Sequence, residues 1–197
     1  CYAEMPWLAL PYSARDAKAS LSKKFKVNGI PSLVVCDGKT GELITTDGRS
    51  AVMEDPEGAN FPWKPPTLWE ALGDEVINQD GDAVAVSELR GAGKALGLYF
   101  SAHWCPPCKA FTPKLVETVK AVKAAGKQLE IIFVSSDRSM ADFQSYFGTM
   151  TGFHAIPQGD KRKEALSKVF DVEGIPTFVT LDADTGATIN ANARGAV

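Results

Sequence analysis

The sequence predicts an α/β fold in which a mixed β-sheet is sandwiched between helices. In residues 67–197, apolar patterns typical of strands alternate with patterns typical of helices, and a β-hairpin pattern comes last. A Cys-Pro-Pro-Cys sequence stands where one strand pattern gives way to a long helical one. Gly29-Ile30-Pro31 recurs as Gly174-Ile175-Pro176, 145 residues later, and a period of that size indicates tandem domains rather than a solenoid.

Residues 1–66 correspond, through this repeat, to the C-terminal half of one unit followed by a Pro-rich linker. The patterns predict a strand at 8–10, a helix from about Asp16 to Lys26, and a hairpin of strands at 32–36 and 42–46. Asp16 is a candidate helix cap. Four prolines in 53–66 exclude a regular helix or a central strand there. Since the chain starts at Cys1 without Met, we expect a fragment whose first unit is truncated.

Residues 67–197 are predicted to form a near-complete unit. A hairpin at 75–77 and 83–86 flanks Asp80-Gly81, which is a strong turn signal. The apolar run 95–100 predicts a buried strand, and from Cys105 onward apolar residues recur at helical spacing. The remaining patterns predict a strand at 129–134, a helix from a cap at Ser139 to about 146, a short strand at 153–156, a helix at 161–170, and a last hairpin at 177–181 and 187–189.

The Cys-Pro-Pro-Cys sequence is the strongest functional signal in the chain. Two cysteines separated by two residues can close a small disulfide, and Cys105 is predicted to stand at a helix N-terminus. The helix dipole favours the thiolate of Cys105 there, and the thiolate is the species that attacks disulfides. Cys108, one turn into the helix, is expected to be more buried. The pattern therefore indicates thiol–disulfide exchange through a redox-active Cys105–Cys108 disulfide, with no other cofactor.

Two other interpretations of the cysteine pair are weaker. A zinc site would need a second pair of ligands, but Cys1, Cys36, His103 and His154 are singly placed. A purely structural disulfide would close so short a loop that it would constrain the unfolded chain only weakly. Cys36 is expected to be a buried small hydrophobe, and Cys1 is assigned no role.

The residues around the pair resemble the nucleoredoxin and tryparedoxin branch of the thioredoxin superfamily. A strand ending Tyr99-Phe100-Ser101-Ala102 precedes Trp104-Cys105-Pro106-Pro107-Cys108, and Gly174-Ile175-Pro176-Thr177 is similar to the family's cis-proline loop. Ordinary thioredoxins usually carry Gly-Pro between the cysteines. More than one copy of the unit favours the nucleoredoxins within this branch.

The resemblance implies a thioredoxin-like fold and assigns roles to individual residues. Cys105 is then the nucleophile and Cys108 the resolving cysteine. The substrate surface is then formed by Trp104, Pro106, Pro107, Ile175 and Pro176. A cis Ile175–Pro176 bond would let a substrate peptide pair with the backbone of Ile175, and Ile30–Pro31 is expected to be cis as well.

Three further positions are candidates. The buried acid of thioredoxin, six residues before the first cysteine, is Tyr99 here, so the base in the reaction is Tyr99, water or another group. A protonated His103 would favour the Cys105 thiolate, although an exposed histidine without a role is an equal alternative. Arg194 matches an arginine that tryparedoxins use near the carboxylates of a small dithiol. Met150-Thr151-Gly152 replaces the family's Met-Pro-Trp, so a substrate-facing tryptophan is missing and partner choice is expected to differ.

Composition and charge restrict the class of protein. Hydrophobic residues make up 45% and charged residues 23%, as in an ordinary globular protein. The net charge of −3 argues against nucleic-acid binding, and no apolar run reaches the length of a membrane span. Four cysteines do not form a disulfide framework in a chain this long, which favours a reducing compartment, the cytoplasm or the nucleus.

Together these observations predict a protein-disulfide reductase. Its substrates are expected to be protein disulfides, and a reductase or a small dithiol is expected to supply the electrons. The alternative is a binding module whose tandem units hold a signalling partner and release it on oxidation. The intact Cys105–Cys108 pair favours the reductase.

Overall fold

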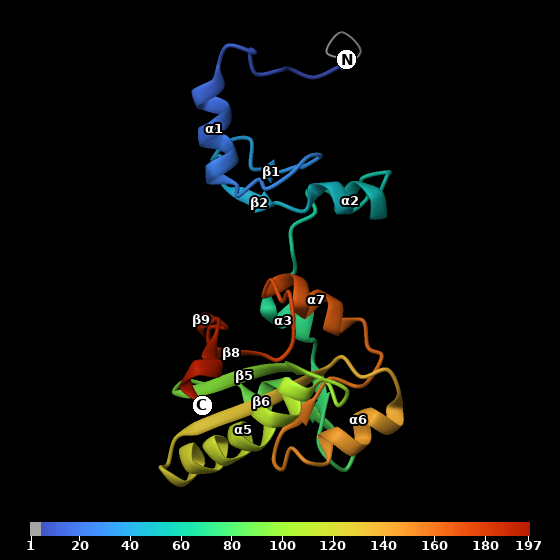
Figure 1. Cartoon of the computed structure of the whole chain (residues 1–197), viewed down its shortest axis with the longest axis vertical. Helices are drawn as coiled ribbons and strands as arrows, with labels where there is room; N and C mark the ends of the chain where they lie inside the picture. Colours follow the sequence, from blue (N-terminus) through green and yellow to red (C-terminus); the bar gives the residue numbers. More distant parts are fainter. Residues whose placement is uncertain (1–4) are drawn as a thin grey trace. The chain divides into compact units, whose positions relative to one another are not determined.

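The computed structural model describes residues 5–197, which fall into two compact units (Figure 1). The first unit ends at Pro65, and the second comprises Pro66–Val197. The second unit carries the Cys-Pro-Pro-Cys sequence, so its architecture positions the site. Cys1, which has no assigned role, lies outside the described residues.

A seven-stranded mixed β-sheet forms the centre of the second unit. Its central strands β5 and β6 run parallel, and β8 pairs antiparallel with the other edge of β5. In spatial order the strands are β4 (Ala83–Ala85), β3 (Glu75–Ile77), β7 (His154–Ala155), β6 (Gln128–Ser135), β5 (Lys94–Ser101), β8 (Thr177–Asp182) and β9 (Thr188–Asn190). The predicted mixed sheet is therefore confirmed, and each predicted strand of 67–197 lies within two residues of its expected bounds.

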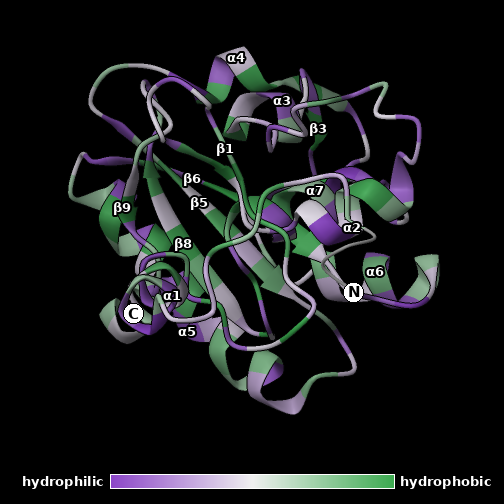
Figure 2. Cartoon of the chain, turned by 90° about the horizontal axis from the view of Figure 1, so that it is seen from above, coloured by the Kyte–Doolittle hydropathy of each residue, from purple (hydrophilic) through white to green (hydrophobic). Residues whose placement is uncertain are grey.

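Helices cover both faces of this sheet, and Figure 2 shows the hydrophobic residues of its strands between them. On one face α5 (Pro106–Ala124) and α6 (Met140–Phe147) pack over a buried aromatic cluster that includes Tyr99 and Phe133. On the other face α3 (Leu68–Leu72), α4 (Val86–Leu89) and α7 (Arg162–Val169) pack against Leu98 and Phe100. Alternate residues of β5 thus belong to opposite cores, because successive side chains of a strand point to opposite faces.

Close packing in the middle of β5 depends on Gly97. A Cβ atom at this position would lie 2.7 Å from the ring of Phe178 and 2.5 Å from Cδ1 of Ile131. Both distances are far below the normal contact of about 3.5–4.0 Å between carbon atoms. The missing side chain lets the neighbouring strands place large residues over β5.

Side-chain caps mark the start of two helices in the second unit. Ser139 accepts a hydrogen bond from the backbone N–H of Asp142, so the predicted cap of α6 is confirmed. Thr67 and Glu70 form a capping box at the start of α3, where the second unit begins. The sequence does not predict α3 and α4, because helices of five and four residues are too short to show a periodic pattern.

The first unit contains α1 (Arg15–Lys24), β1 (Val35–Cys36), β2 (Leu43–Thr45) and α2 (Gly48–Glu54). The strand predicted at 8–10 is wrong: these residues form no strand and are exposed, and no strand of residues 5–197 pairs with them. Asp16 does not cap α1, because the helix begins one residue earlier and Ala14 occupies the cap position. Cys36 is half-buried rather than buried. The sequence does not predict α2.

The repeat is visible in matching local contacts of the two units. The Ile30–Pro31 and Ile175–Pro176 bonds are both cis, as expected, and Phe61–Pro62 is a third cis bond. Asp37 accepts hydrogen bonds from the backbone N–H groups of Lys39 and Thr40, and Asp182 accepts them from the corresponding Asp184 and Thr185. These backbone bonds hold the pKa of both carboxyl groups below the usual value.

Candidate active site around Cys105 and Cys108

Cys105 occupies the N-cap position of α5 and forms a disulfide with Cys108, with their Cα atoms 5.2 Å apart. Cys108 is fully buried and Cys105 is 4% exposed, so the order of burial is the expected one, although neither cysteine is open to solvent in the oxidised form. Pro106 and Pro107 fill the first two helical positions and have no N–H group. The first backbone N–H of α5 therefore belongs to Cys108 itself, and the Cys105 side chain accepts no cap hydrogen bond in this oxidised form. The position of Cys105 at the positive end of the helix dipole favours its thiolate.

The cis-proline loop lies directly against this disulfide. The Sγ atom of Cys105 is 3.8 Å from the carbonyl oxygen of Ile175, which precedes the cis Pro176. Pro176 is buried and Ile175 is half-buried between the two cores. Thr177 braces the loop by donating its hydroxyl hydrogen to the carbonyl of Gly174. Elements 70 residues apart in the sequence are thus brought together at the sulfur that the sequence predicts to be reactive.

Trp104 presents a large apolar surface beside Cys105. Its side chain is 50% exposed, and its indole N–H donates to the carbonyl of Ser136 at 2.9 Å. The guanidinium carbon of Arg138 lies 5.3 Å from the centroid of its ring, within the range of a cation–π contact. Both partners come from the segment that follows β6, so this segment holds the indole in one orientation.

Asp137 anchors the loop that carries Trp104. This carboxylate is buried, and one of its oxygens accepts the backbone N–H of His103 at 2.7 Å. The other oxygen accepts the hydroxyl of Ser135 at 2.8 Å. A buried carboxylate needs such donors to offset the loss of hydration, and the sequence gives no sign that this aspartate reaches the active-site loop.

A buried group of hydroxyls lies beneath the first turns of α5. It consists of Tyr99 and Ser101 from β5, Thr112 from α5 and Tyr146 from α6. Thr112 donates to the carbonyl of Cys108 at 3.0 Å, and the Tyr99 hydroxyl lies 3.4 Å from the same oxygen. Burial raises the pKa of the Tyr99 phenol above its usual value, so this hydroxyl stays neutral near pH 7. Tyr99 therefore offers a hydroxyl dipole here, not a negatively charged base.

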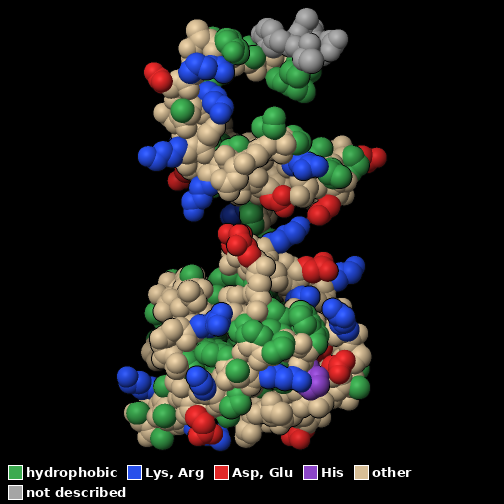
Figure 3. All heavy atoms as spheres, in the orientation of Figure 1, with side chains coloured by type: hydrophobic (Ala, Val, Ile, Leu, Met, Phe, Trp, Pro, Cys, Tyr) green, Lys and Arg blue, Asp and Glu red, His purple; other side chains and the backbone are tan. Residues whose placement is uncertain are grey.

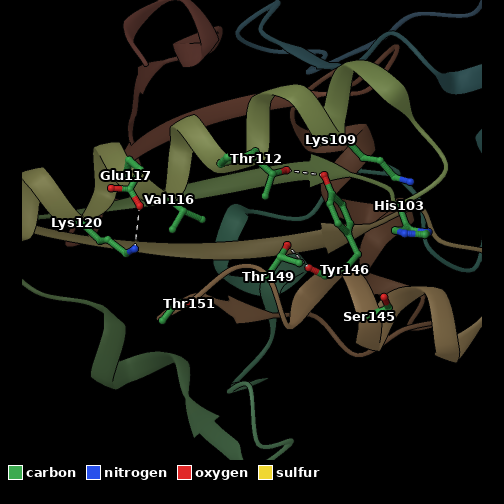
Figure 4. Close-up of a pocket in the computed structure, with 11 residues that line it drawn as sticks. His103, Lys109, Thr112, Val116, Glu117, Lys120, Ser145, Tyr146, Thr149 and Thr151 are labelled. Carbon is green, nitrogen blue, oxygen red and sulfur yellow. Dashed lines mark hydrogen bonds and ion pairs between the residues drawn. The ribbon is translucent and has the colours of Figure 1, made fainter.

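A pocket of about 510 Å³ opens beside this hydroxyl group, between α5 and α6 (Figure 4). Thr112 and Tyr146 lie on its wall, hydrogen-bonded to each other. His103 stands at one end of the pocket, where its Nδ1 atom is 3.6 Å from a carboxylate oxygen of Asp142. The imidazole also packs 5.9 Å from the Tyr146 ring, so His103 is turned toward α6.

Arg194 lies on another side of α5, in the last turn Ala193–Ala196. Its guanidinium carbon is 5.8 Å from the ring centroid of Phe111, which packs against Tyr99. Arg194 is exposed, so its charge remains accessible to a ligand close to the N-terminal half of α5.

The described part of the chain shows no group of three or more His, Cys, Asp or Glu side chains that could hold a metal ion. Within the same residues, no helix has the length and apolar character needed to cross a bilayer. On the face that Figure 3 draws, basic and acidic side chains are interspersed rather than gathered by sign.

Sequence reasoning named the cysteines, Trp104, Tyr99 and the cis-proline loop, but it missed the residues that hold them in place. Ser101 and Thr112 carry a weak signal: Ser101 shares a strand face with Tyr99, and Thr112 follows Cys108 by one helical turn. Tyr146 and Asp137 carry none, because only the packing of α6 and of the segment after β6 brings them to the site.

Comparison with known proteins finds relatives of the same architecture. A family model described as "Thioredoxin-like" matches residues 93–187. The nucleoredoxin of Mus musculus is 42% identical over 180 residues, which are 91% of this chain and 41% of that protein. The chain thus spans less than half the length of this curated relative, and the match is longer than the second unit alone.

Solved tryparedoxin structures share the fold of the second unit. Tryparedoxin I from Leishmania major is 41% identical, with a TM-score of 0.58 over 64% of this chain and 85% of that one. Tryparedoxin II, solved in complex with glutathionylspermidine, is 40% identical, with a TM-score of 0.57 over 62% of this chain and 83% of that one. The predicted thioredoxin-like α/β fold is therefore confirmed.

Proposed function

Because this chain belongs to the nucleoredoxin and tryparedoxin branch of the thioredoxin-like family, we propose that it is a thiol–disulfide oxidoreductase that reduces disulfides in proteins. The Cys105–Cys108 disulfide is the redox group. The single observation that carries the proposal is the position of Cys105. Its sulfur lies at the N-terminus of α5 and 3.8 Å from the carbonyl of Ile175, with the second cysteine buried behind it.

The reaction starts from the reduced pair. The Cys105 thiolate attacks one sulfur of a substrate disulfide, so that a mixed disulfide forms and the other substrate sulfur leaves as a thiolate. Cys108 then loses its proton and attacks Cys105 Sγ. The bond between Cys105 and the substrate breaks, the Cys105–Cys108 bond forms, and the second substrate sulfur leaves and takes up a proton. Two electrons have then passed from the dithiol to the substrate.

The surface around Cys105 suits an extended peptide. Trp104, Pro106 and Pro107 are exposed beside the sulfur and give it an apolar rim. The backbone of Ile175, held by the cis Pro176, borders the same sulfur from the other side. A substrate strand pairing with that backbone would carry its disulfide to Cys105, and its side chains would pack on Trp104.

A small dithiol or a reductase protein returns the pair to its reduced form in this proposal. The tryparedoxin II complex with glutathionylspermidine is a precedent for a small thiol ligand in the branch. Arg194 is the residue we assign to the carboxylate of such a ligand, since its exposed guanidinium lies over Phe111 near the first turns of α5. The reaction requires a reducing compartment, and we propose the cytoplasm or the nucleus.

Reduction of insulin, followed by precipitation of its free B chain with dithiothreitol as donor, tests this function. The wild-type chain is expected to accelerate precipitation, Cys105→Ser is expected to show no acceleration, and the matched control Cys36→Ser is expected to behave as wild type. A wild-type chain that is inactive with dithiothreitol, glutathione and a thioredoxin reductase would contradict the proposal. If the wild type has no reductase activity and Cys105→Ser still binds a partner, the result would favour the binding module instead.

A further inference from the structure

The four buried hydroxyls of Tyr99, Ser101, Thr112 and Tyr146 form a closed ring. The successive oxygen–oxygen distances are 2.8 Å from Tyr99 to Thr112, 2.5 Å from Thr112 to Tyr146, 2.9 Å from Tyr146 to Ser101 and 3.0 Å from Ser101 to Tyr99. We call this group the hydroxyl ring. It joins β5, α5 and α6 at one point in the core.

The ring has fewer hydrogens than contacts. Each of its four hydroxyls carries one hydrogen, whereas the ring offers four internal contacts and two more to the carbonyl oxygen of Cys108, from Thr112 and Tyr99. Ser101 donates to Tyr99, and Thr112 donates to the carbonyl oxygen of Cys108. The hydrogen of Tyr99 then points either to Thr112 or to the same carbonyl, and the hydrogen of Tyr146 points either to Thr112 or to Ser101.

The local structure of α5 makes the hydrogen bonds to the Cys108 carbonyl important. Pro113 lies inside α5, so it donates no hydrogen to the preceding turn and its ring crowds the carbonyl of Lys109. A threonine hydroxyl bonded to the carbonyl four residues before it also bends a helix slightly. Two hydroxyls of the ring therefore hold the peptide group of Cys108 at a point where the helix is weakened.

The geometry points to a role for this ring: we propose that Thr112 and Tyr146 are positioning residues that hold Cys108 in line for its attack on Cys105. The inference rests on the proposed function, because it concerns the second step of that reaction. Thr112 acts directly on the Cys108 carbonyl, and Tyr146 acts through Thr112 and Ser101. Tyr99 stays uncharged near pH 7, since burial raises its pKa.

Loss of one ring hydroxyl is expected to act on the closing of the disulfide and not on the first attack. With a looser Cys108, the Cys108 thiolate attacks more slowly, and closing becomes less favourable at equilibrium. A hydrogen bond of ordinary net strength corresponds to a change of about three- to tenfold. The first attack depends on Cys105, and among the described residues no hydrogen bond joins Cys105 to a hydroxyl of the ring.

The experiment compares Tyr146→Phe and Thr112→Val with two controls. Ser145→Ala removes a hydroxyl from the wall of the same pocket but not from the ring, and Thr112→Ser keeps the ring hydroxyl. Two quantities are measured for each protein: the equilibrium constant of the Cys105–Cys108 couple in glutathione buffers, and the rate at which a mixed disulfide on Cys105 resolves in a single turnover. Thermal unfolding of the oxidised proteins is recorded beside them.

The two ring variants are expected to resolve the mixed disulfide about three- to tenfold more slowly and to lower the closing constant by a similar factor. Both controls are expected to match wild type. Ring variants that are less stable but keep the wild-type resolution rate and closing constant would overturn the proposal. If one of the two ring variants does not fold, the other variant tests the proposal. An inactive wild type would instead refute the proposed function, while the glutathione equilibrium would still test the ring.

Discussion

The two cysteines of the site differ in their surroundings, and this difference predicts their order of reaction. Cys105 stands at the N-cap of α5, whereas Cys108 is fully buried beneath it. In the reduced protein at neutral pH, iodoacetamide is expected to modify Cys105 first, because thiolate character and access both favour it. Peptide mapping by mass spectrometry at short reaction times measures the order. Earlier labelling of Cys108 would overturn the assignment of the nucleophile.

Trp104 is the exposed side chain with the most apolar surface to offer a substrate at this site. It is held by the Ser136 carbonyl and by Arg138, so little freedom remains to be lost on binding. Trp104→Ala is expected to lower kcat/KM for insulin by about tenfold, as for a central contact residue.

The matched control for this substitution is Trp7→Ala, which removes an exposed tryptophan from the first unit. It is expected to leave kcat/KM unchanged. Equal losses in the two variants would show that Trp104 has no special place in substrate binding.

The residues of the site could be predicted to different degrees. The sequence alone identifies Cys105 and Cys108, which are three positions apart, together with Trp104 and the repeated Ile-Pro pair. Tyr146 and Asp137 reach the site only because distant segments pack there, and neither has a local pattern to mark it. Their hydrogen bonds depend on tertiary structure, which short-range periodicity does not report.

At the level of elements, Arg162 joins the start of α7 to the segment between α3 and β3. Its guanidinium donates to the carbonyls of Leu72 and Glu75, and its Nε and Nη2 atoms both donate to Oδ2 of Asp160, with which it forms an ion pair. Arg162→Ala would remove a partly buried hydrogen bond to the Leu72 carbonyl and an exposed one to the Glu75 carbonyl, so the unfolding free energy of the second unit is expected to fall by about 2 kcal/mol. Urea denaturation followed by circular dichroism measures the change.

The pH dependence of stability provides a second test of the contact between Arg162 and Asp160. The hydrogen bond from Arg162 lowers the pKa of Asp160, so the pair contributes stability above the usual carboxyl pKa and loses it as the pH falls through the lowered value. Arg162→Ala is therefore expected to lose less stability on acidification than wild type. Lys161→Ala, an exposed change at the N-cap of α7, serves as control. Wild-type stability in Arg162→Ala would contradict this account.

The long elements were predictable because each has its own pattern. Strands β5, β6 and β8 are mainly apolar, and α5 repeats its apolar residues over five turns. The strand expected at 8–10 failed for the opposite reason: an apolar run becomes a strand only beside a partner, and none is present among the described residues. Helix α2 has seven residues and begins at Gly48, so it is too short to show a clear helical period, although Asp47 holds its N-cap position.

At the scale of the whole molecule, we propose that residues 1–66 are the C-terminal half of a second thioredoxin-like unit followed by a linker, and that 67–197 form the unit with the active site. The matching cis prolines and aspartate turns support this division. In the second unit β8 pairs on both edges, with β5 and β9. Its counterpart β1 pairs only with β2 in the described structure.

Hydrogen exchange is expected to show the consequence of this difference. Amides of residues 32–36 should exchange faster than those of 96–100, because an edge strand with half-buried side chains opens at lower cost than a central buried one. Mass spectrometry of peptic fragments measures both segments in one sample. Equal, strong protection of both segments in a monomeric sample would show that the first unit is stable without further strands.

The central claim is that Cys105 carries the substrate during reduction, and trapping that intermediate tests it most directly. The variant Cys108→Ser, with Cys1 and Cys36 also replaced by serine, cannot resolve a mixed disulfide. After reduction and incubation with insulin, intact mass spectrometry is expected to show one covalent adduct on Cys105 that dithiothreitol removes. The absence of an adduct, or the same adduct when Cys105 is replaced and Cys108 is kept, would contradict the account.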